Sequence, residues 1–186
     1  MSLEIEAKVK VESLKEIADR LAAIGGQLQY DLLQTDTYFD DADHALLAYD
    51  CGLRLRRQKG RAGEKVLLTY KGPRQKTRFK SRDEIEIEVS DFATAVELLT
   101  ALGYQKTLEF DKRRQVWRFL ESTVCLDELP LLGSFLEIEA SSEQTVADTL
   151  RKMELADMPH ISESYAHLIR ARLNELSPDQ MEAFFD

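Results

Sequence analysis

The stretch EIEAK, residues 4–8, lies within a longer segment, residues 3–11, in which apolar and charged side chains alternate. Successive side chains of a β-strand point to opposite faces, so this pattern predicts a strand with one apolar face and one ionic face. Glu4, Glu6 and Lys8 share the ionic face. Later segments of the chain also alternate apolar with charged side chains.

Along the remainder of the chain, segments with the two-residue period of a strand are interspersed with segments that have the period of a helix. Strands are predicted at residues 34–40, 53–59, 66–71, 79–89, 109–119, 123–127 and 135–140. Helices are predicted at residues 13–24, 91–102, 143–153 and 164–176. When the sequence is aligned with itself at a shift of 78 positions, residues 6–25 match residues 84–103. Each segment has the pattern of a charged strand followed by an amphipathic helix and a glycine. This indicates either a sheet built from two related halves or the general similarity of strand-helix units.

Composition narrows the class of protein. The chain has 186 residues, 44% of them hydrophobic, which fits one domain with a buried core. A net charge of −9 disfavours a nucleic-acid coat. No apolar run approaches the roughly 20 residues that span a bilayer, and the N-terminus lacks a signal core, so we expect a cytoplasmic protein without a membrane partner. Cys51 and Cys125 are expected to be reduced thiols.

Full charges dominate one face of strand after strand. Besides the opening strand, the ionic faces hold Arg54 and Arg56; Arg82, Glu84, Glu86 and Glu88; Lys112 and Arg114; and Glu137 and Glu139. One interpretation is a set of solvated sheet faces. The other is that the sheet closes into a barrel with these faces inward, and that the amphipathic helices at residues 13–24, 91–102 and 164–176 cover its apolar outside.

The second interpretation has a chemical consequence. Buried charges must be compensated, so such a lumen would be wet and would hold ligands. Paired carboxylates suit Mg²⁺ or Mn²⁺, and Arg and Lys suit phosphate oxygens. An acidic patch beside a basic lining therefore predicts metal-assisted phosphoryl or nucleotidyl transfer.

These residues resemble a known family over nearly the whole chain. The pattern at residues 4–8 is similar to the ExExK hallmark of the CYTH superfamily, also called triphosphate tunnel metalloenzymes. Further matches are LRLR at residues 53–56, TYKGP at 69–73, RDEIEIE at 82–88, KRR at 112–114, CLDEL at 125–129 and LGSFLEIE at 132–139. The last segment and ESYAHL, residues 163–168, most resemble the class IV adenylate cyclase branch.

The resemblance implies an α+β fold, an eight-stranded antiparallel closed β-barrel (a tunnel) with helices packed on the outside. The expected domain covers residues 1–176, followed by a C-terminal tail at residues 177–186. The implied substrate is a small molecule that carries a triphosphate, such as ATP or polyphosphate, and a homodimer is a family-level expectation.

The same resemblance assigns roles to residues. The metal ligands for Mg²⁺ or Mn²⁺ would be Glu4, Glu6, Glu137 and Glu139. The phosphate clamp would be Arg54, Arg56, Lys71, Arg82, Lys112 and Arg114. Lys8 would contact phosphate and help to activate the nucleophile. The supporting catalytic carboxylates would be Glu84, Glu86 and Asp127.

Three functions stay open on this basis. The first is an adenylate cyclase that converts ATP to cyclic AMP and pyrophosphate. The second is a triphosphatase that hydrolyses tripolyphosphate, thiamine triphosphate or a nucleoside triphosphate. The third is a non-catalytic polyphosphate-binding module. Outside these motifs, Tyr165 is expected to pack a strand against a helix, and residues 74–80 are read either as a guard at the tunnel mouth or as a solvated hairpin arm.

Overall fold

The computed structural model describes residues 2–75, 80–177 and 179–185, and the side chains of all of these except residues 2–4, 80 and 81. The described strands are β1 (Ser2–Lys10), β2 (Gln27–Asp40), β3 (Gly52–Gly60), β4 (Gly63–Lys71), β5 (Lys80–Val89), β6 (Gln105–Phe119), β7 (Ser122–Leu129), β8 (Gly133–Ala140) and β9 (Glu182–Ala183). The described helices are α1 (Leu14–Ala23), α2 (Ala45–Ala48), α3 (Phe92–Ala101), α4 (Glu143–Lys152) and α5 (Tyr165–Leu176).

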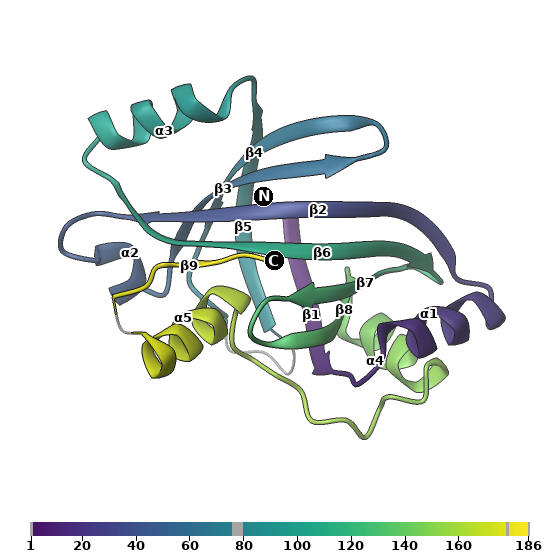
Figure 1. Cartoon of the computed structure of the whole chain (residues 1–186). Helices are drawn as coiled ribbons and strands as arrows, with labels where there is room; N and C mark the ends of the chain where they lie inside the picture. The colour runs from purple at the N-terminus through teal and green to yellow at the C-terminus, as the bar shows by residue number, and fades with distance from the viewer. Residues whose placement is uncertain (1, 76–79, 178, 186) are drawn as a thin grey trace.

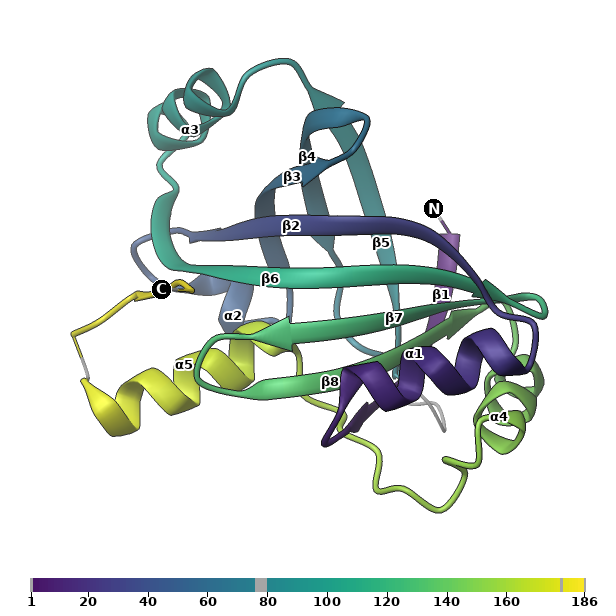
Figure 2. The ribbon, with the colours of Figure 1, turned by 45° about the vertical axis from the view of Figure 1, so that its right-hand side comes forward.

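The strands form one sheet in the order β2-β3-β4-β5-β1-β8-β7-β6-β9, and β2 also pairs with β6. Every pairing among β1 to β8 is antiparallel. The sheet curls into a half-barrel, with β1, β3, β4 and β5 running across the direction of β2, β6, β7 and β8 (Figures 1 and 2). The α+β class and the curled antiparallel sheet are thus confirmed, whereas complete closure into a tunnel stays a prediction.

The two related halves indicated by the sequence are confirmed by the strand pairing. Exchanging β1, β2, β3 and β4 for β5, β6, β7 and β8 leaves the order of neighbours around the sheet unchanged. Under this exchange the β1–β5 pair and the β2–β6 pair each map onto themselves. The helices α1 and α3 follow equivalent strands, β1 and β5. The fold is therefore a pseudo-twofold arrangement of two strand-helix-strand units.

Helix starts follow the capping residues in the sequence. The hydroxyl of Ser13 accepts a hydrogen bond from the backbone N–H of Glu16, and the Asp91 carboxylate accepts one from Thr94. These side chains satisfy amides that have no partner within the helix. Gly25 and Gly103 follow the ends of α1 and α3 with φ of 93° and 92°, a conformation that glycine adopts without steric cost.

Most helices cover the apolar outer face of the curled sheet. Leu21 of α1 and Leu150 of α4 pack in one cluster with Val9 of β1 and Ile138 of β8. Helix α3 places Leu99 in a second cluster over β3 and β4. These strand residues alternate with the charged positions, so burying the outer face directs the charges to the concave face.

Helix α5 is an exception to the predicted outer layer. Its residues Ile169 and Leu173 pack with Phe110 of β6 and Phe135 of β8. Phe110 is two positions from Lys112, and Phe135 is two positions from Glu137, so these residues face the concave side. The expectation that the helix at residues 164–176 covers the outside was therefore wrong, because one end of the concave face is apolar and accepts α5.

The observed elements also differ from the predicted ones in the short helix α2, which was not predicted, and in the bounds of several strands. Strand β2 begins at Gln27 rather than at residue 34, because its first half pairs with β6 without burying an alternating apolar face. The short strand β9 lies in the predicted tail, where it pairs with β6 and buries Ala183. The domain boundary between residues 176 and 177 stays a prediction. None of the described helices has the length and apolarity to cross a membrane.

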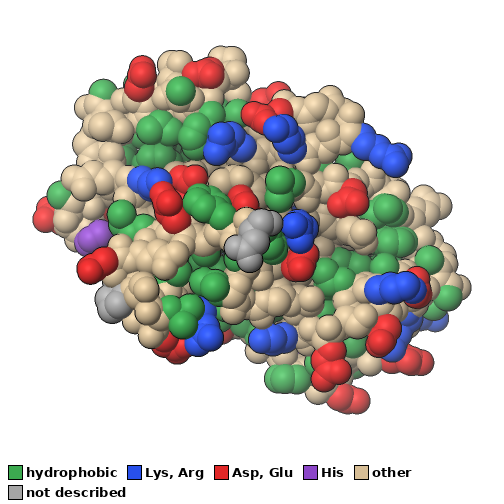
Figure 3. All heavy atoms as spheres, in the orientation of Figure 1, with side chains coloured by type: hydrophobic (Ala, Val, Ile, Leu, Met, Phe, Trp, Pro, Cys, Tyr) green, Lys and Arg blue, Asp and Glu red, His purple; other side chains and the backbone are tan. Residues whose placement is uncertain are grey.

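One face of the molecule mixes both signs of charge. On the face drawn in Figure 3, acidic and basic side chains are interspersed among hydrophobic and other residues. The grouped charges of the strands line the cavity on the concave side of the sheet.

We predict that Leu21→Ala lowers the free energy of unfolding by about 2–5 kcal/mol. Leu21 is fully buried between α1 and the sheet, so the substitution leaves a cavity in the main cluster. Urea unfolding followed by circular dichroism measures the change. Leu98→Ala is the control, because Leu98 is exposed on α3. Equal stability of the two variants would contradict the packing described here.

Candidate functional site

The concave side of the sheet encloses a cavity of about 1780 Å³. Predicted site residues lining it are Glu6, Lys8, Arg54, Arg56, Lys71, Arg82, Glu84, Glu86, Lys112, Arg114, Glu137 and Glu139. Asp127 is fully buried behind this lining, against Arg114. The side chain of Glu4 lies outside the described part of the structure, although its backbone pairs with Arg82. The structure thus brings together residues that are more than 130 positions apart in sequence.

One wall of the cavity is acidic and is formed by β1 and β8. Glu6 lies opposite Glu139, and Lys8 lies opposite Glu137 in the antiparallel register. The Lys8 ammonium is 3.2 Å from a carboxylate oxygen of Glu6 and 3.2 Å from one of Glu137. Burial by itself lowers the pKa of Lys8, but the carboxylates of Glu137 and Glu6 outweigh it and raise that pKa above its ordinary value. Lys8 is therefore a firmly protonated cation.

The acidic wall has the donor chemistry of a hard-metal site. Glu6, Glu137 and Glu139 supply carboxylate oxygens, which Mg²⁺ and Mn²⁺ prefer. Within the described residues, no group of three or more acidic, His or Cys side chains is already gathered as a metal site. The carboxylates instead contact Lys8 and Arg114. The donors fit the metal in kind, while their present partners are protein cations.

Arg114 lies at the centre of the next wall. Its guanidinium donates two hydrogen bonds to Asp127, at 2.7 and 2.6 Å, and a third to Glu137. A two-pronged pair of this kind fixes the guanidinium plane. Asp127 is fully buried and makes no lining contact, so its geometry supports orientation of the clamp more directly than metal binding.

A second buried carboxylate, Asp36 of β2, holds the arginines of β3. Arg56 donates to both Asp36 oxygens, at 2.5 and 2.7 Å, and Arg54 lies 3.9 Å away. Burial by itself raises the pKa of Asp36, but the guanidinium groups of Arg56 and Arg54 outweigh burial and hold it well below its ordinary value. Sequence reasoning missed Asp36, because β2 carries one acidic residue between Gln34 and Tyr38 and no repeated charge pattern.

In the wall formed by β4 and β5, charged and polar side chains pair between neighbouring strands. Lys71 contacts Glu84 directly opposite it. Glu86 accepts a hydrogen bond from the hydroxyl of Thr69 at 2.8 Å and lies 3.5 Å from Arg54. At the rim, Asp50 lies 3.7 Å from Arg82 and also accepts hydrogen bonds from Arg74. Glu84 and Glu86 thus hold cations of the basic lining in place.

Arg74 is exposed and contacts the rim of the cavity, which fits the interpretation of residues 74–80 as a guard at the mouth. Residues 76–79 lie outside the described part of the chain. The choice between that interpretation and a solvated arm therefore stays open for the rest of this segment.

Lys112 differs from the other cations of the lining. It is 2% exposed, and within the described residues no carboxylate lies within ion-pair distance of its ammonium group. Burial and the neighbouring Arg114 guanidinium lower the pKa of Lys112 to about 8. Lys112 is thus a buried lysine with a lowered pKa and, in the part of the chain that the structure describes, no carboxylate at ion-pair distance.

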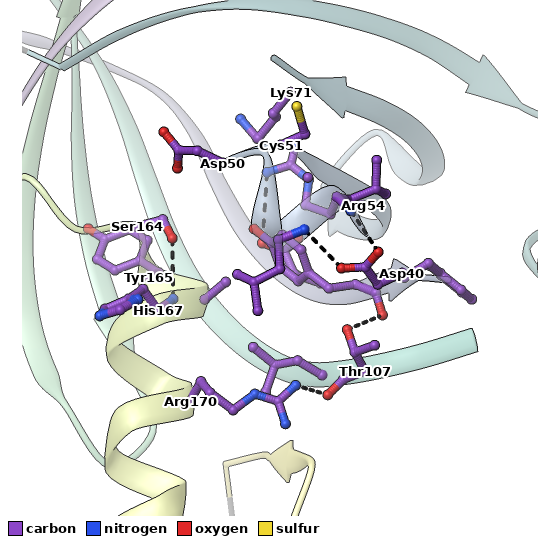
Figure 4. A pocket seen from close by; sticks show the side chains of 18 of the residues that line it. Asp40, Asp50, Cys51, Arg54, Lys71, Thr107, Ser164, Tyr165, His167 and Arg170 are labelled. Atoms are coloured by element: carbon purple, nitrogen blue, oxygen red, sulfur yellow. Dashed lines mark hydrogen bonds and ion pairs between the residues drawn. The ribbon is translucent and has the colours of Figure 1, made fainter. Parts of the chain in front are cut away.

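Helix α5 completes the cavity on the side opposite β3 and β4. Figure 4 shows Tyr165, His167 and Arg170 of this helix, with Ser164 just before it, across the pocket from Arg54 and Lys71. Arg170 donates a hydrogen bond to the backbone carbonyl of Thr107. Tyr165 does more than pack, because it is buried against the charged residues of the lumen. The expectation that Tyr165 packs a strand against a helix is confirmed, since it lies in one buried cluster with Leu129 and Phe135.

Comparison with known proteins matches most of the chain to one family. A family model described as the CYTH domain matches residues 2–167. A putative adenylate cyclase from Methanocaldococcus jannaschii is 29% identical over 139 residues, which cover 75% of this chain and 77% of the relative.

Solved structures share the fold. A protein from Pyrococcus horikoshii superposes with a TM-score of 0.77 at 27% identity, covering 89% of this chain and 97% of that chain. A putative adenylyl cyclase from Hippeastrum, for which a dominant triphosphatase activity is described, superposes with a TM-score of 0.69 at 19% identity, covering 92% and 96% of the two chains. At that identity the second likeness supports the fold alone.

We predict that Asp36→Asn lowers the free energy of unfolding at neutral pH by about 3–5 kcal/mol, because it leaves buried arginines without their counter-charge. The pKa of Asp36 is lowered on folding, so the stabilisation by its carboxylate is complete above its unfolded pKa of about 3.9 and is lost as the pH falls through the folded pKa. Urea unfolding at pH 7 measures the first effect, and a series from pH 4 downward measures the second, in which the difference between the two proteins narrows as the pH falls. Asp148→Asn, which removes an exposed carboxylate, should change little.

We expect metal-free tripolyphosphate to bind more weakly as the pH rises through about 8, because Lys112 loses its proton there. Isothermal titration calorimetry between pH 7 and pH 9 measures the affinity. Lys112→Arg, which stays protonated, should remove the part of the pH dependence that comes from the protein, while the titration of the phosphate ligand is common to both proteins. The same pH dependence in both proteins would contradict the assignment to Lys112.

Proposed function

The chain belongs to the CYTH family, and on that premise we propose that it is a metal-dependent enzyme that acts on a triphosphate-bearing substrate in its cavity. The proposed reaction is that of an adenylate cyclase, in which ATP gives cyclic AMP and pyrophosphate. The observation that carries the proposal is the placement of an acidic wall on β1 and β8 beside a lining of arginine and lysine side chains.

The basic lining has the chemistry of a polyphosphate clamp. Arg54, Arg56 and Arg114 present guanidinium groups that are oriented by buried carboxylates, and Lys112 adds an ammonium group without an internal counter-ion within the described chain. Guanidinium groups match the spacing of phosphate oxygens, and an oriented donor loses little entropy when it binds. Lys71 and Arg82 would extend the clamp toward the rim.

The shape of the cavity supports a nucleotide rather than bare tripolyphosphate. We propose that the sheet closes around the substrate as a tunnel, which the pairing of β2 with both β3 and β6 supports. The cavity of about 1780 Å³ exceeds the roughly 300–1,000 Å³ typical of small-molecule pockets. Beyond the clamp it continues past Leu46 and Leu47, an apolar rim suited to an organic group on the triphosphate.

The proposed metal ligands are Glu6, Glu137 and Glu139, with Glu4 as the fourth candidate. A bound Mg²⁺ or Mn²⁺ would neutralise charge on the phosphate oxygens and favour the leaving pyrophosphate. The remaining contributions come from the chain itself. The clamp holds the triphosphate so that attacking and leaving oxygens lie in line, and its fixed cations stabilise the charge that develops.

The proposed bond changes are balanced. The 3′-oxygen of ATP bonds to the α-phosphorus, the bond from that phosphorus to the bridging oxygen breaks, and pyrophosphate leaves. The 3′-hydroxyl gives up a proton, which needs an acceptor. The proton passes to water, while Lys8, held 3.2 Å from carboxylate oxygens of Glu6 and of Glu137, would contact phosphate and help to activate the nucleophile by electrostatic attraction.

The alternative enzyme is a triphosphatase, in which water attacks a terminal phosphorus in the same cavity. The activity described for the Hippeastrum protein is the observation that keeps this alternative. Incubation with ATP, tripolyphosphate or thiamine triphosphate, each with Mg²⁺ or Mn²⁺, separates the candidates by their products. Cyclic AMP with pyrophosphate supports the cyclase, and orthophosphate supports the triphosphatase. Tight binding without turnover would support a polyphosphate-binding module.

We predict that Glu6→Gln and Glu139→Gln each abolish metal-dependent turnover and leave the fold intact, because both side chains are partly exposed to the cavity and supply proposed metal ligands. Turnover against metal concentration and circular dichroism are the measurements. Glu88→Gln is the matched control, since Glu88 pairs with Lys65 in an exposed position. Near-normal activity of either test variant would refute the metal assignment.

A further inference from the structure

Tyr165 occupies the first position of α5, where the chain is anchored to β1. The backbone N–H of Ile161 donates to the Lys8 carbonyl at 2.9 Å, and the Lys8 ammonium donates to the Glu163 carbonyl at 2.8 Å. The hydroxyl of Ser164 caps the helix by accepting from the N–H of His167. The segment before α5 is thus tied to the strand that carries the EIEAK motif, and Tyr165 is delivered to a fixed place in the lumen.

The hydroxyl of Tyr165 acts on the centre of the basic lining. It donates to an Asp127 carboxylate oxygen at 2.9 Å, and Asp127 receives the two hydrogen bonds of Arg114. Burial and the Asp127 carboxylate raise the pKa of Tyr165 well above its ordinary value, so the phenol keeps its proton and stays a donor. A third hydrogen bond therefore restrains the carboxylate that orients Arg114.

The ring of Tyr165 lies against two ammonium groups from different strands. Lys8 Nζ is 4.2 Å and Lys112 Nζ is 5.2 Å from the ring centroid. Strands β1 and β6 are three pairings apart in the sheet, about 14 Å if the sheet were flat. The curl brings both lysines to one aromatic ring, which Phe135 fixes by an edge contact at 5.3 Å between centroids and 72° between planes.

We infer that Tyr165 is a positioning residue of the lumen, which sets the places of Lys8, Lys112 and Arg114 relative to one another so that they meet phosphate groups as one set. The inference rests on the proposed function for its consequence in turnover, while the arrangement itself is independent of any substrate. Cation–π contacts are strongest where water is excluded, and Lys8, Lys112 and Tyr165 are all buried. No motif in the EIEAK strand or the basic strands indicates this role, because the residue comes from a helix.

The first test needs no substrate. Proton NMR of the lysine ε-methylene groups reports whether an aromatic ring lies over them, because ring currents shift these resonances upfield, and Lys8→Arg and Lys112→Arg assign the two signals. We expect two upfield-shifted lysines in the unmodified protein and in Tyr165→Phe, which keeps the ring. Both should return to ordinary positions in Tyr165→Leu. Unshifted lysines in the unmodified protein, or shifts that persist in Tyr165→Leu, would overturn the inference.

The second test separates the ring from the hydroxyl by kinetics on the substrate that the enzyme turns over. Tyr165→Phe should lower kcat by about tenfold with little change in KM, because Arg114 is less well aligned for the transition state. Tyr165→Leu should also raise KM by about tenfold, because the lysines lose their fixed places. Tyr104→Leu is the matched control, since Tyr104 packs under α3 away from the lumen. Unchanged kcat and KM in Tyr165→Leu would refute the positioning role, whatever the reaction.

Discussion

The cost of burying charge governs this structure. The concave face of the sheet holds arginine, lysine, aspartate and glutamate side chains that are largely withdrawn from water, and an unpaired charge in such a place is strongly destabilising. The chain meets this cost with paired networks, among which Lys8 with Glu137, Arg114 with Asp127 and Arg56 with Asp36 are buried on both sides. The apolar outer face, the covering helices and the curl of the sheet together place these pairs around one cavity.

Pairing also explains why the site residues differ in character. Arg54, Arg56 and Arg114 have carboxylate partners and fixed planes, so they supply orientation. Lys112 shares the lumen with them, and its ammonium group lies over the ring of Tyr165. Within the described chain no carboxylate is at ion-pair distance from it, so its charge can pair with an incoming anion. On β1 and β8, the carboxylates of Glu6 and Glu137 form ion pairs with Lys8. One wall thus offers oxygen donors and the others offer cations.

Much of the site could be predicted because its charges repeat with the period of a strand. That period placed Glu6, Arg54 and Glu137 on the concave face, and the packed outer clusters confirm its direction. Asp36 and Tyr165 escaped this logic, since each is a single residue whose importance lies in contacts with distant strands. The inward position of α5 escaped as well, because periodicity gives the width of an apolar stripe and not which side of the sheet receives it.

The internal pairing of the lumen has a consequence for how any ligand enters it. An anion that reaches Arg54 competes with Asp36 and Glu86 for the same guanidinium, and a cation that reaches Glu6 or Glu137 competes with Lys8. Entry is therefore an exchange of partners rather than the filling of an empty charged hole. In this respect the cavity behaves as an ion-exchange resin of fixed geometry, whose selectivity is the difference between the counter-ion it releases and the one it takes up.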